Sequence, residues 1–217
     1  MSLAIFDLDN TLLNGDSDHS WGEFMCERDL VEVDSYRQQN DQFYQDYLTG
    51  SLDMTAYVAF ALDPLKHMSQ DQRSSLHQEF MQEKIAPMRL PKADALVEKH
   101  RNQGDTLLII TATNEFITGP IAVELGIEHL LATTPELVNG RFSGRIIGAP
   151  CFQGGKVTRL QAWLTENQQR LEGSYFYSDS INDLPLLETV DHPVAVDPDK
   201  KLESLAKERD WTIISLR

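Results

Sequence analysis

Two aspartates follow directly after the first apolar segment of the chain. The residues from Leu3 to Phe6 form an apolar run of strand length, and Asp7 and Asp9 come next with one leucine between them. Side chains two positions apart on an extended chain point the same way, so both carboxylates face one small volume. Two unit charges 4 Å apart repel by about 4 kcal/mol at an effective dielectric of about 20, so the pair needs a cation, a shared proton or water. A lone Asp-x-Asp is also common as an acidic turn.

Later segments of the chain end or begin with polar groups of complementary kinds. Thr111 ends a second apolar run and opens the next helix, Lys156 stands at the start of another helix, and Asp179 and Asp183 follow a third apolar run. The carboxyl ends of parallel strands lie at one edge of a sheet, where ligands bind. Carboxylates there would take Mg²⁺, while lysine, threonine and free helix amides would hold a phosphate. The combination predicts a site for phosphoryl transfer.

Each of these residues has a simpler explanation when it is taken alone. Thr111 could be only a helix cap, Lys156 could be only a solvent-exposed cation, and Asp183 is the acid that a helix dipole favours near its N-terminus. Their common position at strand ends and helix starts favours the chemical interpretation.

Composition limits the partners of this chain. It has 217 residues, 41% of them hydrophobic and 24% charged, and a formal net charge of −15. Nucleic acids and anionic membranes are therefore unexpected partners, because binding them needs clustered Lys and Arg. Apolar runs are far shorter than the ~20 residues of a membrane span. We expect a cytoplasmic protein that acts on a small molecule; the sequence does not indicate the oligomeric state.

The pattern of helices and strands predicts an α/β fold with an insertion. After the first strand the chain reads as amphipathic helix from about residue 16 to 87, with Asp34 as an N-cap and Ser69 to Gln72 as a capping box. Residues 88–217 then alternate between helices and strands, with a hairpin around residues 139–140. We predict a doubly wound parallel sheet formed by residues 1–15 and 88–217, with residues 16–87 as an all-helical cap.

The four polar segments, in this order, resemble the motifs of the haloacid dehalogenase superfamily, in particular its phosphoserine phosphatase-like branch with a helical cap between the first two motifs. The resemblance covers essentially the whole chain. It implies a phosphatase with a Rossmann-like core. Its motif residues here are Asp7-Leu-Asp9-Asn-Thr11, Thr111 after Leu-Leu-Ile-Ile, Lys156 after Gly-Gly, and Asp179-Ser-Ile-Asn182-Asp183.

The resemblance also implies a role for each residue. Asp7 would be the nucleophile that forms an aspartyl-phosphate, and Asp9 would be the general acid and then the base. Mg²⁺ would be held by the side chains of Asp7 and Asp179 and the backbone carbonyl of Asp9, with Asp183 just behind them. The phosphate and substrate would meet Thr111, Ala112, Lys156, Asn182 and Asp16.

The chain departs from the family pattern at two motifs, and the departure at Ala112-Thr113 makes the turn that faces the substrate bulkier. Ala112-Thr113 replaces a Gly-Gly pair that is frequent in phosphoserine phosphatases, and Ser178 replaces a frequent glycine before Asp179. Asp16 matches the family acid that meets a substrate amine, whereas the stretch 55–61 lacks the arginine that meets a substrate carboxylate. The remaining cap arginines, Arg28, Arg37 and Arg73, lie in stretches that read as exposed.

The expected substrate is therefore an amino-alcohol phosphate such as histidinol phosphate. Phosphoserine, phosphoethanolamine and phosphocholine remain alternatives. A phosphomutase would use the same residues. A phospho-receiver domain would lack the long insertion and Asp9, a dehalogenase would need neither Asp9 nor a metal, and a protein that only holds metal would leave Lys156 and Thr111 without a role.

Overall fold

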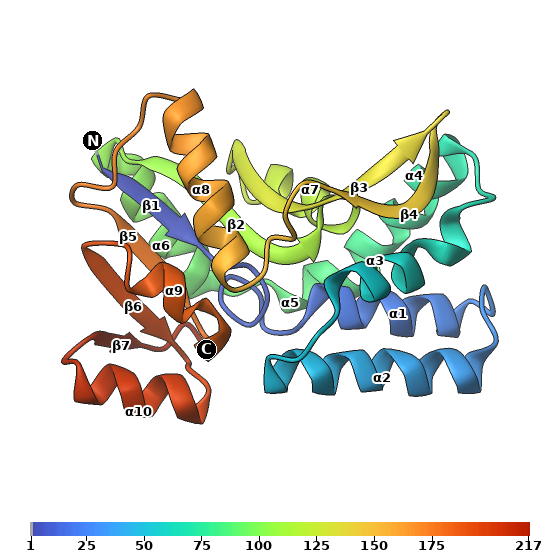
Figure 1. Cartoon of the computed structure of the whole chain (residues 1–217), viewed down its shortest axis with the longest axis horizontal. Helices are drawn as coiled ribbons and strands as arrows, with labels where there is room; N and C mark the ends of the chain where they lie inside the picture. Colours follow the sequence, from blue (N-terminus) through green and yellow to red (C-terminus); the bar gives the residue numbers. More distant parts are fainter. Residues whose placement is uncertain (1) are drawn as a thin grey trace.

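A computed structural model describes residues 2–217, and its centre is one mostly parallel β-sheet (Figure 1). The strand order is β4-β3-β2-β1-β5-β6-β7, and only the β3–β4 pair is antiparallel. The strands are β1 (Leu3–Phe6), β2 (Thr106–Asn114), β3 (His129–Val138), β4 (Arg141–Ile147), β5 (Tyr175–Ser178), β6 (His192–Val196) and β7 (Thr212–Ile214). This confirms the predicted doubly wound α/β fold.

Helices cover both faces of the sheet because its central strands are apolar on both sides. Ala4 and Phe6 of β1 belong to a cluster with residues of α6 (Pro91–Gln103) and α7 (Glu115–Glu124). Leu3 and Ile5 point the other way, as the period of two requires, and join residues of three other helices. Those helices are α8 (Gly154–Glu166), α9 (Leu184–Leu187) and α10 (Lys200–Glu208).

The segment between β1 and α6 is helical throughout and forms a separate layer beside the sheet (Figure 1). It contains α1 (Ser17–Glu27), α2 (Val33–Thr49), α3 (Met54–Leu62), a 3₁₀ turn (Asp63–Leu65), α4 (Gln70–Phe80), a π turn (Met81–Ile85) and α5 (Ala86–Met88). The chain leaves and returns side by side, since Asn14 N donates to Met88 O at 2.8 Å and Leu13 pairs with Arg89. These adjacent connections support treating residues 16–87 as an insertion, or cap, in a core of residues 1–15 and 88–217. Among the described residues, no helix is long and apolar enough to cross a membrane.

The sequence predicted the N-terminal capping residues of two helices, and one of these two predictions is confirmed. The capping box is present, because Gln72 N donates to Ser69 Oγ at 3.2 Å and Ser69 N donates to Gln72 Oε1 at 2.8 Å. The prediction of Asp34 as an N-cap was wrong. Helix α2 starts at Val33, and Glu32, two positions before Asp34, caps it by accepting from Ser35 N at 3.0 Å; Asp34 already lies within the first turn.

The expectation that Thr111 opens a helix was also wrong. Strand β2 runs on to Asn114, whose side chain caps α7 by accepting from Ile117 N at 3.3 Å. The strand continues because β3 still pairs with it there: Asn114 is in register with Thr133 after an irregularity in the ladder. β-Branched Thr111 and Thr113 suit this extended backbone.

The predicted hairpin is present and has an unexpected neighbour. Strands β3 and β4 turn at Asn139 and Gly140, which have φ of 51° and 75°. The hairpin reaches across to α3 and α4 of the cap (Figure 1), where Arg73 Nη2 donates to Gly140 O at 2.8 Å and its guanidinium lies over the Phe142 ring. Arg73 is therefore buried, and the expectation that it lies on an exposed face was wrong.

Candidate active site

A buried lysine lies between two buried aspartates at the carboxyl edge of the sheet. Lys156 Nζ is 2.8 Å from Asp7 Oδ1 and 2.7 Å from Asp183 Oδ1, and all three side chains are at least 95% buried. Burial alone would lower the pKa of Lys156, but the two carboxylates outweigh it and raise that pKa above its usual range. The lysine is therefore held as a cation against Asp7.

The turn before Lys156 brings it there. Gly155, the preceding residue, lies so close to the Pro150 carbonyl that a Cβ on it would be 2.0 Å from that oxygen. Only glycine allows this approach. The start of α8 then directs Lys156 under the end of β1.

Asp7 is the first residue after β1, and its backbone N continues the ladder by donating to Tyr177 O at 2.9 Å. Burial raises the pKa of Asp7 to about 7, while Lys156 opposes this shift and Asp183 adds to it. Asp179, at the end of β5, lies beside the same group, and its Oδ1 accepts from Thr11 Oγ1 at 3.1 Å. Burial, followed by Asp7 and Asp183, raises the pKa of Asp179 well above its usual range.

This group of carboxylates has the composition of a Mg²⁺ site. Asp7, Asp179 and Asp183 supply hard oxygen donors, and Lys156 is the cation that contacts two of them. The raised pKa of Asp179 shows that its charged form lacks sufficient compensation within the protein. A divalent cation would provide that compensation, and carboxylate oxygens are donors of the kind that Mg²⁺ takes.

Asp9 lines the same pocket as Asp7, and its carboxylate has hydrogen-bond partners of its own. Its Oδ1 accepts from the backbone N of Ser17 at 2.6 Å, and its Oδ2 accepts from Thr113 Oγ1 at 2.7 Å. Burial and then the charge of Asp16 raise the pKa of Asp9 to about 7, against the effect of the two hydrogen bonds. Such a carboxyl can both carry and release a proton near neutral pH.

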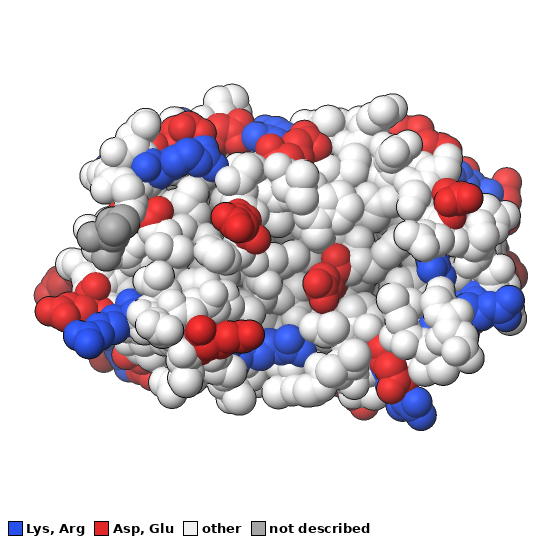
Figure 2. Space-filling model, turned by 90° about the horizontal axis from the view of Figure 1, so that it is seen from above, with Lys and Arg blue, Asp and Glu red and all other residues white. Residues whose placement is uncertain are grey.

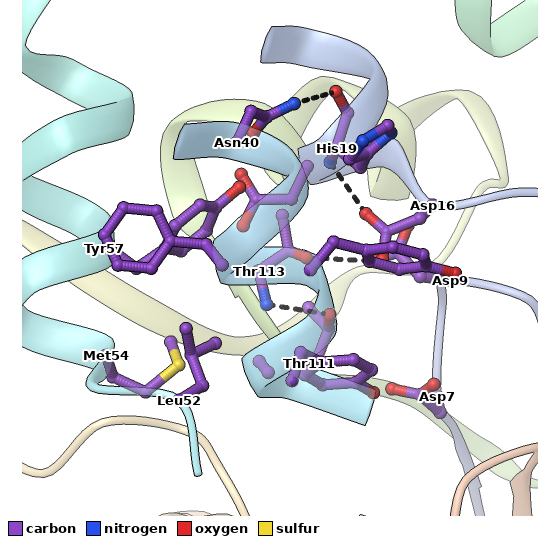
Figure 3. A pocket seen from close by; sticks show the side chains of 15 residues that line it. Asp7, Asp9, Asp16, His19, Asn40, Leu52, Met54, Tyr57, Thr111 and Thr113 are labelled. Atoms are coloured by element: carbon purple, nitrogen blue, oxygen red, sulfur yellow. Dashed lines mark hydrogen bonds between the residues drawn. The ribbon is translucent and has the colours of Figure 1, made fainter. Parts of the chain in front are cut away.

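Asp16 lines the pocket and also caps the N-terminus of a cap helix. As the N-cap of α1 it accepts from His19 N at 2.8 Å, and it also lines the pocket between the core and the cap (Figure 3). Burial is the main reason for its raised pKa. The predicted amine-binding acid thus also fixes the start of the cap.

Of the remaining residues predicted to bind substrate, two line the pocket and one contacts the cap. Thr111 and Ala112 line the pocket beside Asp7, and Thr111 Oγ1 accepts from Thr113 N at 3.2 Å (Figure 3). Asn182 is at the edge of the core, where its Nδ2 donates to Tyr47 O at 2.8 Å. That amide therefore also joins the core to α2 of the cap.

The pocket has an empty volume of about 490 Å³ and lies between the end of the sheet and the cap. Figure 3 shows Asp7 and Thr111 on one side, with Tyr57, Leu52 and Met54 from the cap on the other. The full lining is Asp7, Asp9, Asp16, Asp18, His19, Asn40, Phe43, Tyr44, Tyr47, Leu52, Met54, Tyr57, Thr111, Ala112 and Thr113. Of these described residues, four are acids and none is Lys or Arg.

The arginines of the cap, Arg28, Arg37 and Arg73, do not line the pocket. Arg28 pairs with Glu79 and Glu83, and Arg37 pairs with Glu23. Arg73 contacts the hairpin, as described above. On the face drawn in Figure 2, Lys and Arg side chains are scattered among acidic ones and form no continuous basic patch.

Sequence reasoning missed three polar residues of the pocket region. Thr113 was noted only as a replacement for glycine, yet its hydroxyl holds Asp9. Asp18 is 8% exposed and is contacted by Asn114 Nδ2 at 3.4 Å, although in sequence it is only an acid in a helical first turn. Tyr47 supplies a carbonyl to Asn182, a backbone role that no side-chain pattern reveals.

Comparison with known proteins gives the class of the molecule. The model of the haloacid dehalogenase-like hydrolase family matches residues 4–188. A histidinol-phosphatase from Neisseria meningitidis is 44% identical over 220 residues, covering 100% of this chain and 99% of that protein. A phosphoserine phosphatase from Mycobacterium tuberculosis is 32% identical and covers 99% of this chain and 70% of its own length.

Solved structures agree with the fold. A protein of unknown function from Bordetella pertussis superposes with a TM-score of 0.93 at 40% identity, over 100% of this chain and 99% of the other. A substrate-bound phosphoserine phosphatase superposes with a TM-score of 0.71 at 15% identity, over 98% and 92% of the two chains, which shows the shared fold.

The fold and the matched family therefore define a hydrolase of the haloacid dehalogenase type. The chain belongs to the haloacid dehalogenase-like hydrolase family, and the relatives from Neisseria meningitidis and Mycobacterium tuberculosis described above, which share at least 32% of its residues, are phosphatases.

Proposed function

We propose that the chain is a Mg²⁺-dependent phosphatase that hydrolyses a small amino-alcohol phosphate through an aspartyl-phosphate on Asp7. The observation that carries the proposal is the buried contact of 2.8 Å between Lys156 Nζ and Asp7 Oδ1 beside a pocket lined by acids. Lys156 opposes the effect of burial on the pKa of Asp7 and so favours the ionised form that a nucleophile requires, and it offers a positive charge to a phosphate.

Mg²⁺ would be held by the side chains of Asp7 and Asp179 and the backbone carbonyl of Asp9, with Asp183 adjacent. The bound ion would neutralise charge on the phosphate and on these carboxylates. Asp183 also holds Lys156, so it joins the metal-binding group to the phosphate-binding cation.

The reaction would proceed in two steps. In the first, an Asp7 oxygen attacks phosphorus, the bond from phosphorus to the alcohol oxygen breaks, and protonated Asp9 gives its proton to the departing alkoxide. In the second, ionised Asp9 takes a proton from water as the water attacks phosphorus, and the bond to Asp7 breaks. Thr111 and Lys156 would hold phosphate oxygens in both steps.

The pocket supports a cationic leaving group. Asp16 and Asp18 add two carboxyl groups to those of Asp7 and Asp9, and the aromatic rings of Tyr44 and Tyr57 form part of the wall. Burial raises the pKa of both Asp16 and Asp18, and a cationic group bound beside them would favour their ionised forms. No Lys or Arg among the described pocket residues could pair with the carboxylate of phosphoserine. The similar protein from Neisseria meningitidis is named a histidinol-phosphatase, which agrees with an amino-alcohol substrate.

A panel of phosphomonoesters tests this proposal. Release of inorganic phosphate would be measured with histidinol phosphate, phosphoethanolamine, phosphocholine, phosphoserine and a sugar phosphate, each with Mg²⁺. We expect kcat/KM for histidinol phosphate to exceed that for phosphoserine by at least about tenfold, equivalent to ~1.4 kcal/mol of transition-state binding. Phosphoserine as the best substrate would contradict the amino-alcohol proposal, and absence of phosphate release from every ester would contradict phosphatase activity itself.

A further inference from the structure

The carboxylate of Asp9 is held on both of its oxygens by donors from two different parts of the fold. Ser17 N, at the start of cap helix α1, donates to Oδ1 at 2.6 Å, and Thr113 Oγ1, near the end of β2, donates to Oδ2 at 2.7 Å. Thr113 is 5% exposed, and Figure 3 shows its side chain directed at Asp9 across the pocket. The backbone donor at Ser17 survives any substitution that leaves the backbone in place, whereas the donor at Thr113 is specific to this side chain.

Two donors on opposite oxygens fix the plane of a carboxyl group. One donor alone would allow rotation about the Cβ–Cγ bond, so the proton would point in several directions. A carboxylate has about four lone-pair sites, and two remain free for proton transfer after both donors are satisfied. General acid catalysis depends strongly on this orientation, because the proton must lie within hydrogen-bond reach of the leaving oxygen.

The backbone of Thr113 limits the directions in which its hydroxyl can point. The residue lies in an extended strand, where β-branched side chains have a restricted χ1 angle. Its backbone N is already used, since it donates to Thr111 Oγ1 at 3.2 Å. Thr113 is thus anchored through its main chain to the predicted phosphate-binding threonine and through its side chain to the predicted acid.

We propose that Thr113 is a positioning residue that orients Asp9 for proton transfer to the leaving alcohol. This inference rests on the proposed function of Asp9 and adds a residue to it. The hydroxyl donates to Asp9 Oδ2 while the carboxyl gives its proton to the alkoxide, whose bond to phosphorus breaks as the Asp7–phosphorus bond forms. A glycine at this position could not supply that hydrogen bond.

The dependence of the rate on the leaving group distinguishes this role from simple packing. An alkoxide needs a proton as it leaves, but p-nitrophenolate leaves without one. In single-turnover experiments with excess enzyme, Thr113→Val should slow release of histidinol from histidinol phosphate by about tenfold, part of the 10²–10⁴ that general acids contribute. Release of p-nitrophenol from p-nitrophenyl phosphate should change by less than about twofold, because that step makes no demand on Asp9.

The serine variant is the matched control. Valine has nearly the shape of threonine but no hydroxyl, whereas Thr113→Ser keeps the hydroxyl and removes the methyl group, so Thr113→Ser should restore most of the histidinol rate. Equal slowing of both substrates, or a serine variant as slow as the valine variant, would overturn the inference. Wild-type enzyme that releases neither alcohol would instead contradict the proposed function, so the two failures are distinguishable.

Discussion

The side-chain amide of Asn182 donates to the backbone carbonyl of Tyr47 at 2.8 Å, and so the edge of the core holds the C-terminal turn of cap helix α2. Gln153 reinforces the contact: its Nε2 donates to Gly50 O at 3.1 Å and lies 3.4 Å from Asn182 Oδ1. Gly50 adopts φ of 77° at the end of α2, which turns the chain towards the core. The cap is thereby joined to the loop that carries Asp179 and Asp183.

Removing one of these contacts should weaken substrate capture. Gln153→Ala deletes the bond to Gly50 and the 3.4 Å contact with Asn182 Oδ1, and it leaves the side chains of Asp7 and Lys156 unchanged. A hydrogen bond contributes about 0.5–1.5 kcal/mol, so kcat/KM should fall by roughly twofold to tenfold, mainly through KM, because a looser cap encloses the substrate less well. Steady-state kinetics would measure this effect. The prediction is wrong if kcat falls while KM stays constant.

Asp7→Asn should abolish turnover and preserve the fold. The amide has nearly the same shape as the carboxylate but cannot attack phosphorus, so almost the whole rate enhancement should be lost. Lys156→Ala removes a charge-stabilising group and leaves Asp7 and Asp183 without their buried cation, and it should cost on the order of 10²–10³ in kcat. Activity of Asp7→Asn within tenfold of the wild type, with an unchanged circular dichroism spectrum, would refute covalent catalysis at this residue.

Asp16→Asn should remove the preference for amines. Asparagine is as good an N-cap as aspartate, so helix α1 should still begin at the same residue, while the negative charge near the substrate amine is lost. We expect the ratio of kcat/KM for histidinol phosphate over phosphoserine to fall by about tenfold. p-Nitrophenyl phosphate, which has no amine, serves as the reference substrate. An unchanged ratio would show that Asp16 acts only as a helix cap.

Activity should require Mg²⁺, and Ca²⁺ should inhibit. Ca²⁺ takes 6–8 oxygen ligands at longer distances than Mg²⁺ and can bind both oxygens of one carboxylate. At Asp7 this would leave no free oxygen for attack on phosphorus. Phosphate release would be measured in excess chelator, after addition of Mg²⁺, and with Ca²⁺ in competition. Full activity in excess chelator would exclude a metal role for Asp179.

The raised pKa of Asp9 predicts a pH-dependent difference in stability between the wild type and Asp9→Asn. With a folded-state pKa of about 7 against 3.8 as the ordinary value, the folded protein binds more protons than the unfolded chain between about pH 4 and 7. The free energy of unfolding of the wild type should therefore fall over this window as pH rises. Asp9→Asn has no titrating carboxyl at this position, so its free energy of unfolding should not show this decrease.

Thermal unfolding in chelator would measure the difference. The Tm of Asp9→Asn minus that of the wild type should increase from pH 5 to pH 8, by about 2–4 °C for each kcal/mol that the wild type loses. Subtraction cancels the titrating groups that do not interact with Asp9, whereas Asp16, whose charge raises the pKa of Asp9, contributes to the measured difference. A difference in Tm that does not change with pH would mean that Asp9 has an ordinary pKa.

Local patterns were sufficient to predict the sheet and the edge at which polar side chains gather. The apolar run before Asp7 is typical of a strand buried on both faces, and the alternation of helices and strands after residue 88 indicated parallel pairing. Parallel strands share one carboxyl edge, so the sequence predicted that Asp7, Asp9, Thr111 and Asp179 converge, with Lys156 as the balancing charge. The structure shows Lys156 in direct contact with Asp7 and Asp183.

Tertiary packing decided what the local patterns left open. Thr111 was expected to start a helix, but pairing with β3 carried the strand on to Asn114 and brought Thr113 to Asp9. Arg73 reads as exposed from its polar neighbours, yet the hairpin covers it. A sequence pattern records which side of its own element a residue occupies, whereas contacts between elements distant along the chain depend on how those elements pack. For this reason the sequence by itself determined the fold and the aspartates of the site, and only the tertiary structure decided which groups orient Asp9 and which hold the cap.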